Sequence, residues 1–143
     1  MKAVFVAVSL LACGSASAAD DPSAEPRSAK TAEADGKTVY EHICQGCHMP
    51  QAQGAVGAGH YPKLAGDPAL VSWQYVATTV LKGRNGMPAF GTPVSPDGAF
   101  ASVKLNDQQI AVVVNYVRSH FGNTYKDRVT AEQVAKLPHP AGG

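Results

Sequence analysis

Hydrophobic residues recur at three- and four-residue spacing in a long stretch near the C-terminal end of the sequence. They are Ile110, Val113, Val114, Val117 and Phe121. This spacing is that of one buried face of an α-helix. Asn106 and Gln109 form a capping-box pattern before it, and Gly122-Asn123 follows it as a stop. Because valine also favours strands, a strand is the alternative, but the length and the period of the stretch favour a helix.

Three other segments carry shorter helical patterns. Residues 31–43 combine good helix formers with a stripe of Val39, Tyr40 and Ile43. Residues 68–81 predict a third helix, and residues 130–137 a short fourth one that opens on Thr130 and Gln133. Segments 49–67 and 83–105 are rich in glycine and proline and predict loops. No alternating pattern of useful length occurs, so we expect an all-α fold with no significant sheet.

The composition narrows the class of protein. A chain of 143 residues favours one domain. A formal charge of +1 argues against a protein that binds nucleic acid. No apolar run approaches the roughly 18–20 residues that a membrane-spanning helix needs.

The N-terminal residues predict a secretory signal peptide over residues 1–19. Lys2 precedes an apolar run at 3–12, and Ala16-Ser17-Ala18 gives the small-x-small pattern before cleavage after residue 18 or 19. A buried N-terminal helix is a weaker alternative because no cap or polar face accompanies the run. Residues 10–13 also resemble a lipoprotein box that would lipidate Cys13. Cleavage there leaves a leader of only 12 residues, so we favour an unlipidated periplasmic protein with a flexible linker at 20–29.

Removal of the leader leaves two cysteines, in the sequence Cys44-Gln45-Gly46-Cys47-His48. Cys-x-x-Cys-His is the attachment signature of c-type haem. On a helix the two thiols and the imidazole share one face, so both sulfurs can form thioethers while His48 ligates the iron. A thioredoxin-like pair lacks its βαβ context, and a zinc site lacks further ligands. A plain disulfide would leave His48 without a role.

A second iron ligand follows by elimination among methionines and histidines, which are common axial ligands. Met1 leaves with the leader, and Met49 adjoins His48 too closely to reach the opposite haem face. Met87 lies in a bend-prone loop, Gly83-Arg84-Asn85-Gly86-Met87-Pro88, that would let the backbone approach a flat cofactor. A core-filling methionine is the alternative. The remaining histidines (42, 60, 120 and 139) are better read as surface residues. We therefore predict one haem c with His48 and Met87 as its metal ligands.

With these motifs the sequence resembles the class I cytochromes c over residues 30–122. The resemblance implies a cytochrome c fold, with three to five helices around one covalently bound haem. In that family, a glycine and an aromatic residue of the N-terminal helix lie where it crosses the C-terminal helix. Gly36 and Tyr40 match these two residues, and Val113 and Tyr116 match the C-terminal helix at the crossing. Close approach of the two backbones would explain the glycine.

The same resemblance assigns three further cofactor-binding residues. The carbonyl of Pro62 would accept a hydrogen bond from the second nitrogen of His48, which fixes the ring and raises its basicity. Arg84 and Trp73 are placed like residues that contact haem propionates. Residues 123–143 form a C-terminal extension, similar to that of cytochromes that serve dehydrogenases.

Function follows from the coordination. Two protein ligands leave no open position on iron, so we expect a monomeric electron carrier and no enzyme. Its redox partners would be a flavin- or quinone-dependent dehydrogenase as donor and a cytochrome or terminal oxidase as acceptor. Two alternatives stay open: a cytochrome subunit fixed in a dehydrogenase complex, and a haem sensor or peroxidase in which Met87 is displaced.

Overall fold

The computed structural model describes residues 35–57, 59–91 and 103–140. The predicted signal peptide, Cys13, the linker at 20–29 and the start of the first predicted helix lie outside the described residues. So does most of the loop between Gly91 and Leu105. Within the described residues the fold is mainly helical, with one small two-stranded sheet.

The first helix runs to the end of the Cys-x-x-Cys-His motif. Residues 35–39 are α-helical, Tyr40–Cys44 form a π-helical turn, and α2 covers Gln45–His48. The helix therefore ends five residues later than the predicted boundary at residue 43. It ends at Met49, whose φ of 67° is left-handed. A π turn is a wider turn that often lies at functional sites.

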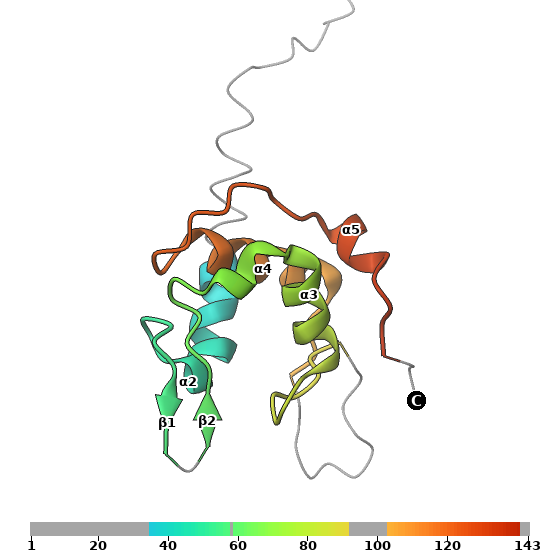
Figure 1. Ribbon diagram of the computed structural model, residues 1–143. Helices are drawn as coiled ribbons and strands as arrows, with labels where there is room; N and C mark the ends of the chain where they lie inside the picture. Colours follow the sequence, from blue (N-terminus) through green and yellow to red (C-terminus); the bar gives the residue numbers. More distant parts are fainter. Residues whose placement is uncertain (1–34, 58, 92–102, 141–143) are drawn as a thin grey trace, which may run out of the picture.

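The long periodic stretch forms α4, Asp107–Ser119, and both halves of its predicted capping box are present. Nine consecutive residues from Ile110 to Arg118 are buried, so α4 is the central element of the core. Phe121 and Gly122, at φ 57° and 81°, turn the chain out of the helix. In Figure 1 the N-terminal helix and α4 pass close to each other in the upper part of the molecule.

Gly36 lies at the crossing of these two helices. A Cβ atom built on Gly36 would stand 2.3 Å from the carbonyl oxygen of Val112 and 2.8 Å from the Cβ of Tyr116. The expected crossing with a C-terminal helix is therefore present. On α4, Gly36 faces Tyr116, as expected, and the backbone of Val112. The resemblance had implied Val113 in place of Val112. Val113 is itself buried in the core.

We expect Gly36→Val to destabilise the holoprotein, because any side chain at this position must push the two helices apart. Overpacking of this kind costs about 1–3 kcal/mol, occasionally more. Thermal melts of the holoprotein measure the effect. Gly46→Val is the matched control on the same helix, since a Cβ there meets nothing within 4 Å. Equal melting temperatures for the two variants would contradict the close crossing.

The predicted helix at 68–81 consists of two elements. A 3₁₀ helix, η2, covers Pro68–Val71, and α3 covers Trp73–Lys82. Ser72 separates them with an extended backbone, and its hydroxyl caps α3 by accepting from the amide of Tyr75. The predicted loop at 49–67 also contains a short hairpin, with β1 at Ala55–Val56 and β2 at His60–Tyr61.

The C-terminal extension packs along α4 and contains α5, Ala131–Ala135, which has the predicted capping box. Val129 and Val134 bury their side chains in the same core. Farther on, the ring of His139 donates to Asp107 at the start of α4 (2.8 Å) and to the carbonyl of Leu137, which together raise the pKa of His139. The extension is thus part of the folded unit. No helix among the described residues is long and apolar enough to cross a membrane.

Candidate haem site

His48 is the last residue of α2, and its side chain is buried, with 8% of its surface exposed. Its Nδ1 lies 2.9 Å from the carbonyl oxygen of Pro62. A carbonyl can only accept, so Nδ1 must carry the proton. The other ring nitrogen, Nε2, is then left with a lone pair, as an iron ligand requires. The hydrogen bond that the resemblance implied is therefore present.

The segment that carries Pro62 is held against the turn that follows His48. The carbonyl of Ala52 accepts from the amides of Leu64 and Ala65, at 2.8 and 3.0 Å. Gly54 lies directly under this segment: a Cβ there would stand 2.4 Å from the carbonyl oxygen of Tyr61. Since Gly54 also has a φ of +67°, glycine is required for two reasons at this position.

Cys44 and Cys47 are both free thiols, one helical turn apart. Burial raises the pKa of the Cys44 thiol to about 12, and the neighbouring Cys47 adds to the rise. A thiolate at Cys44 would therefore be unfavourable, whereas a neutral thioether suits the same surroundings. The pair fits covalent attachment of haem, with its sulfurs and the His48 ring on one helix face.

Met87 lies in a tight turn after α3. Asn85 and Gly86, the two central residues, both have positive φ, at 48° and 89°, as a type I′ turn requires. Arg84 and Met87 exchange backbone hydrogen bonds of 3.1 and 2.9 Å across this turn. Gly83 ends α3 at φ +70°, and a Cβ there would stand 2.3 Å from the carbonyl oxygen of Met87. The Met87 backbone therefore lies directly against Gly83 at the end of α3. The Met87 side chain is half-buried and packs against the core.

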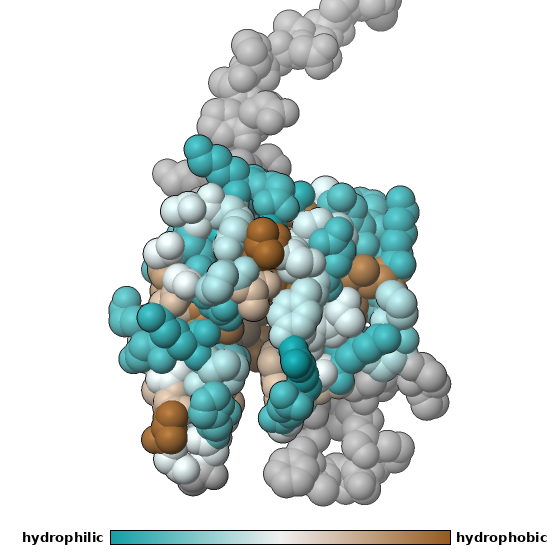
Figure 2. Space-filling model, viewed as in Figure 1, coloured by the Kyte–Doolittle hydropathy of each residue, from teal (hydrophilic) through white to brown (hydrophobic). Residues whose placement is uncertain are grey.

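The histidine and the methionine come from different arms of the molecule. Figure 1 shows α2 and the hairpin as one arm, and α3 with the following segment 83–91 as the other. Figure 2 shows the surface hollowed between these arms, with pale to brown residues in its depth. Half-buried apolar residues pack against the core on both sides: Ile43 just before α2 and Leu64 just after β2, and Trp73, Met87 and Phe90 in α3 and the segment that follows it. An apolar hollow between a histidine arm and a methionine arm fits a flat, largely apolar cofactor.

The two residues assigned to propionates differ in their surroundings. Trp73 begins α3 and is half-buried against the core. Arg84 is exposed, donates a hydrogen bond to the hydroxyl of Tyr75, and holds its guanidinium 5.5 Å from the centre of that ring. Tyr75 was not among the predicted site residues. The sequence signal that could have found it is an aromatic residue in the helix before the methionine loop.

Comparison with known proteins decides the family. The sequence matches the family described as Cytochrome c over residues 33–121. This chain belongs to the cytochrome c family. Members of this family hold haem c covalently, which agrees with two free cysteines next to a buried histidine.

Several cytochromes are similar to this chain. The fructose dehydrogenase cytochrome subunit of Gluconobacter japonicus is 33% identical over 137 residues, which cover 89% of this chain and 26% of that protein. The gluconate 2-dehydrogenase cytochrome c subunit of Pantoea cypripedii is 36% identical over 114 residues, covering 71% and 23%. Cytochrome c-552 of Thermus thermophilus is 33% identical over 116 residues, covering 74% and 76%. The chain thus spans about a quarter of the two dehydrogenase subunits and about three quarters of cytochrome c-552.

Proposed function

We propose that this cytochrome c carries single electrons on one haem, attached through Cys44 and Cys47 and ligated by His48 and Met87. When bound, the haem supplies an iron atom that alternates between the ferric and ferrous states. The buried His48 ring carries the proposal, because its hydrogen bond to Pro62 leaves Nε2 as a ligand on the face that holds both cysteines.

The protein ligands decide which chemistry is available. If His48 and Met87 both ligate the iron as proposed, no position on the iron would be left open to substrate or oxygen. The chain therefore contributes orientation, a low-polarity surrounding and exclusion of water, and makes or breaks no bond of its own. A methionine ligand favours the ferrous state more than a second histidine would, so the potential should suit an acceptor of electrons from a dehydrogenase.

The proposed donor is a flavin- or quinone-dependent dehydrogenase in the periplasm, and the proposed acceptor is a cytochrome or terminal oxidase. The names of the two similar dehydrogenase subunits support the donor class. We propose that the carrier acts as a monomer, with the short-lived, small interfaces that redox encounters use. Rapid reduction of the purified holoprotein by dehydrogenases from the same organism tests the donor class.

Covalent attachment is the most direct test of the cofactor assignment. In denaturing electrophoresis, haem-peroxidase staining should colour the protein band, since thioethers survive unfolding. The double variant Cys44→Ala with Cys47→Ala should lose the stain. Its folded yield should also fall, because in so small a domain the haem forms much of the core. Haem that acid acetone extracts from the wild-type protein would overturn the assignment.

A further inference from the structure

We propose that Asn123, the first residue of the C-terminal extension, is a positioning residue for His48. It fixes the segment that presents the Pro62 carbonyl, and it lies beyond the end of the family match at residue 121. The inference rests on the proposed function, because it concerns how the iron-ligating imidazole is oriented.

The Asn123 side chain is buried, with 6% of its surface exposed, and both its amide nitrogen and its oxygen have hydrogen-bond partners in the protein. Nδ2 donates to the carbonyls of Leu64 (2.9 Å) and Val117 (2.7 Å). Oδ1 accepts from the amide of Asp67 at 3.1 Å. A carboxamide supplies the two N–H donors and the one acceptor that these partners need. An aspartate would instead place a carboxylate oxygen, which cannot donate, against the carbonyl oxygens of Leu64 and Val117.

These contacts brace the segment 64–67 from outside its own loop. Two residues before it, the carbonyl of Pro62 accepts from His48. The contacts to Ala52 tie the segment only to the turn that His48 itself begins. Asn123, helped by a bond from the Gly66 amide to the carbonyl of Phe121 (3.0 Å), ties it to the end of α4. These bonds therefore anchor the segment next to the Pro62 carbonyl to α4, in which nine consecutive residues are buried.

The consequence for iron follows from the basicity of His48. A short, well-aligned bond from Nδ1 to Pro62 makes the imidazole a stronger donor to the metal and favours the ferric state. If the segment 64–67 loosens, this bond weakens and the reduction potential rises. General loosening of a haem pocket that admits water favours the ferric state instead, so the potential falls. The direction of the shift separates positioning from mere structural support.

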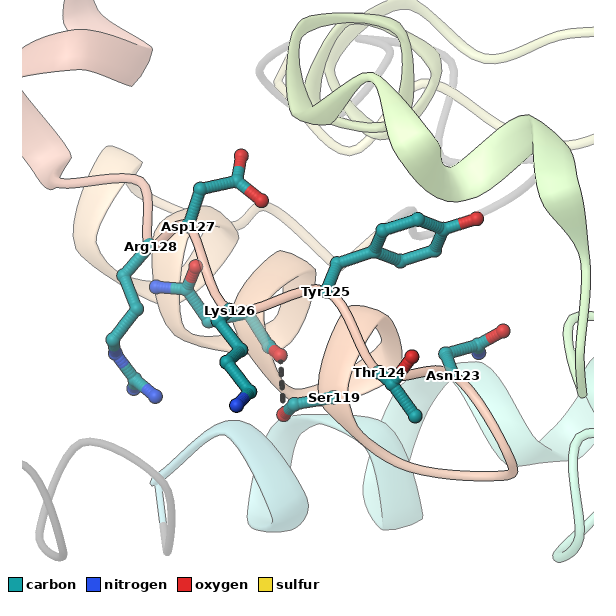
Figure 3. Close-up of a pocket in the computed structure, with 8 residues that line it drawn as sticks. Ser119, Asn123, Thr124, Tyr125, Lys126, Asp127 and Arg128 are labelled. Carbon is teal, nitrogen blue, oxygen red and sulfur yellow. Dashed lines mark hydrogen bonds between the residues drawn. The ribbon is translucent and has the colours of Figure 1, made fainter.

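Helix α4 offers a control that leaves this segment alone. Asn115, a second buried asparagine, donates from Nδ2 to the carbonyl of Val129 (2.8 Å) and accepts from its amide (2.9 Å). A groove of about 340 Å³ lies beside α4 and residues 123–128, and both asparagines contribute to its lining. In Figure 3 the Asn123 carboxamide is directed away from the following residues of the extension, consistent with its bonds to the neighbouring segment.

The experiment compares Asn123→Ala with Asn115→Ala in the holoprotein. The readouts are thermal stability, the reduction potential, and the exchange rate of the His48 Nδ1 proton in the diamagnetic ferrous state by NMR. Both variants should melt at lower temperature. Asn123→Ala should also exchange the Nδ1 proton at least about tenfold faster, which would correspond to about 1.4 kcal/mol, and raise the potential. Asn115→Ala should change neither quantity.

The proposal is overturned if the two variants share the same exchange rate and potential, or if the Asn123→Ala potential falls. Should Asn123→Ala fail to fold, Asn123→Ser replaces it, and hydrogen exchange of the wild-type protein in mild denaturant gives a second test. There the Asp67 amide and the His48 Nδ1 proton should exchange with a common free energy, and different free energies would contradict the coupling. Failure of the proposed function is distinguishable, because the wild-type His48 would then lack the ring-current-shifted signals of a haem ligand.

Discussion

Met87→Ala is expected to abolish the weak far-red absorption band of a sulfur–iron bond, lower the reduction potential, and let the reduced protein bind carbon monoxide. If Met87 ligates the iron as proposed, the substitution removes a thioether ligand that favours ferrous iron, and the space left by the side chain admits water. Truncation to alanine should leave the surrounding turn in place, because its bonds run between the backbones of Arg84 and Met87. Optical spectra, redox titration and carbon monoxide binding measure the three effects.

Met49→Ala is the matched control, since Met49 is the other methionine of the described residues. Its left-handed backbone ends the first helix, and its carbonyl, which accepts from the Tyr40 hydroxyl at 2.8 Å, remains in the variant. Met49→Ala should keep the far-red band. Loss of the band in this variant and its retention in Met87→Ala would exchange the roles of the two residues.

Arg118→Met is expected to be the most destabilising substitution in the core. Arg118 is 1% exposed, and its guanidinium donates to the carbonyls of Leu70 (2.8 Å), Val71 (3.0 Å) and Asp127 (2.7 Å). Methionine fills a similar volume but cannot donate to these carbonyls. Each carbonyl left without a donor lowers the stability of the folded protein by about 1–3 kcal/mol. We expect a loss of at least about 3 kcal/mol in the free energy of unfolding, measured by denaturant titration.

Asp127→Asn is the contrasting variant at the same contact. The Asp127 carboxylate pairs with Arg118 at 2.8 Å, but its side chain is 62% exposed. The hydrogen bond from Arg118 lowers the pKa of Asp127, so the pair is complete at neutral pH and is lost only as the pH falls through this lowered pKa. Exposed pairs contribute at most about 1 kcal/mol. Similar losses for Arg118→Met and Asp127→Asn would show that the backbone acceptors contribute little.

Local sequence signals predicted the helices whose starts depend on neighbouring side chains. The boxes at Asn106 and Thr130 are both present, and the helices α4 and α5 begin directly after them. Such caps need only residues three positions apart, so a sequence can show them. The Met87 loop was predicted as a bend from its glycines and proline, and the structure places positive φ at Asn85 and Gly86, a favoured pair for such a turn.

Features that depend on distant parts of the chain were missed or misplaced. The first helix runs past the predicted boundary at residue 43 to His48, with a π-helical turn at Tyr40–Cys44 followed by α2. Ser72 was read as part of a helix but caps the next one. Asn123 was read as a stop for α4, and only its bonds to Leu64 and Asp67, more than fifty residues away, reveal the brace behind His48.

Carbon monoxide binding by the reduced wild-type protein at neutral pH tests the electron-carrier proposal most directly. If His48 and Met87 occupy both axial positions, the ferrous spectrum should stay unchanged under carbon monoxide while small reductants still reduce the ferric protein rapidly. Ready formation of a carbon monoxide complex, before any substitution, would mean that Met87 is displaced or is no ligand. A ligand-binding haem sensor or peroxidase would then replace the electron carrier.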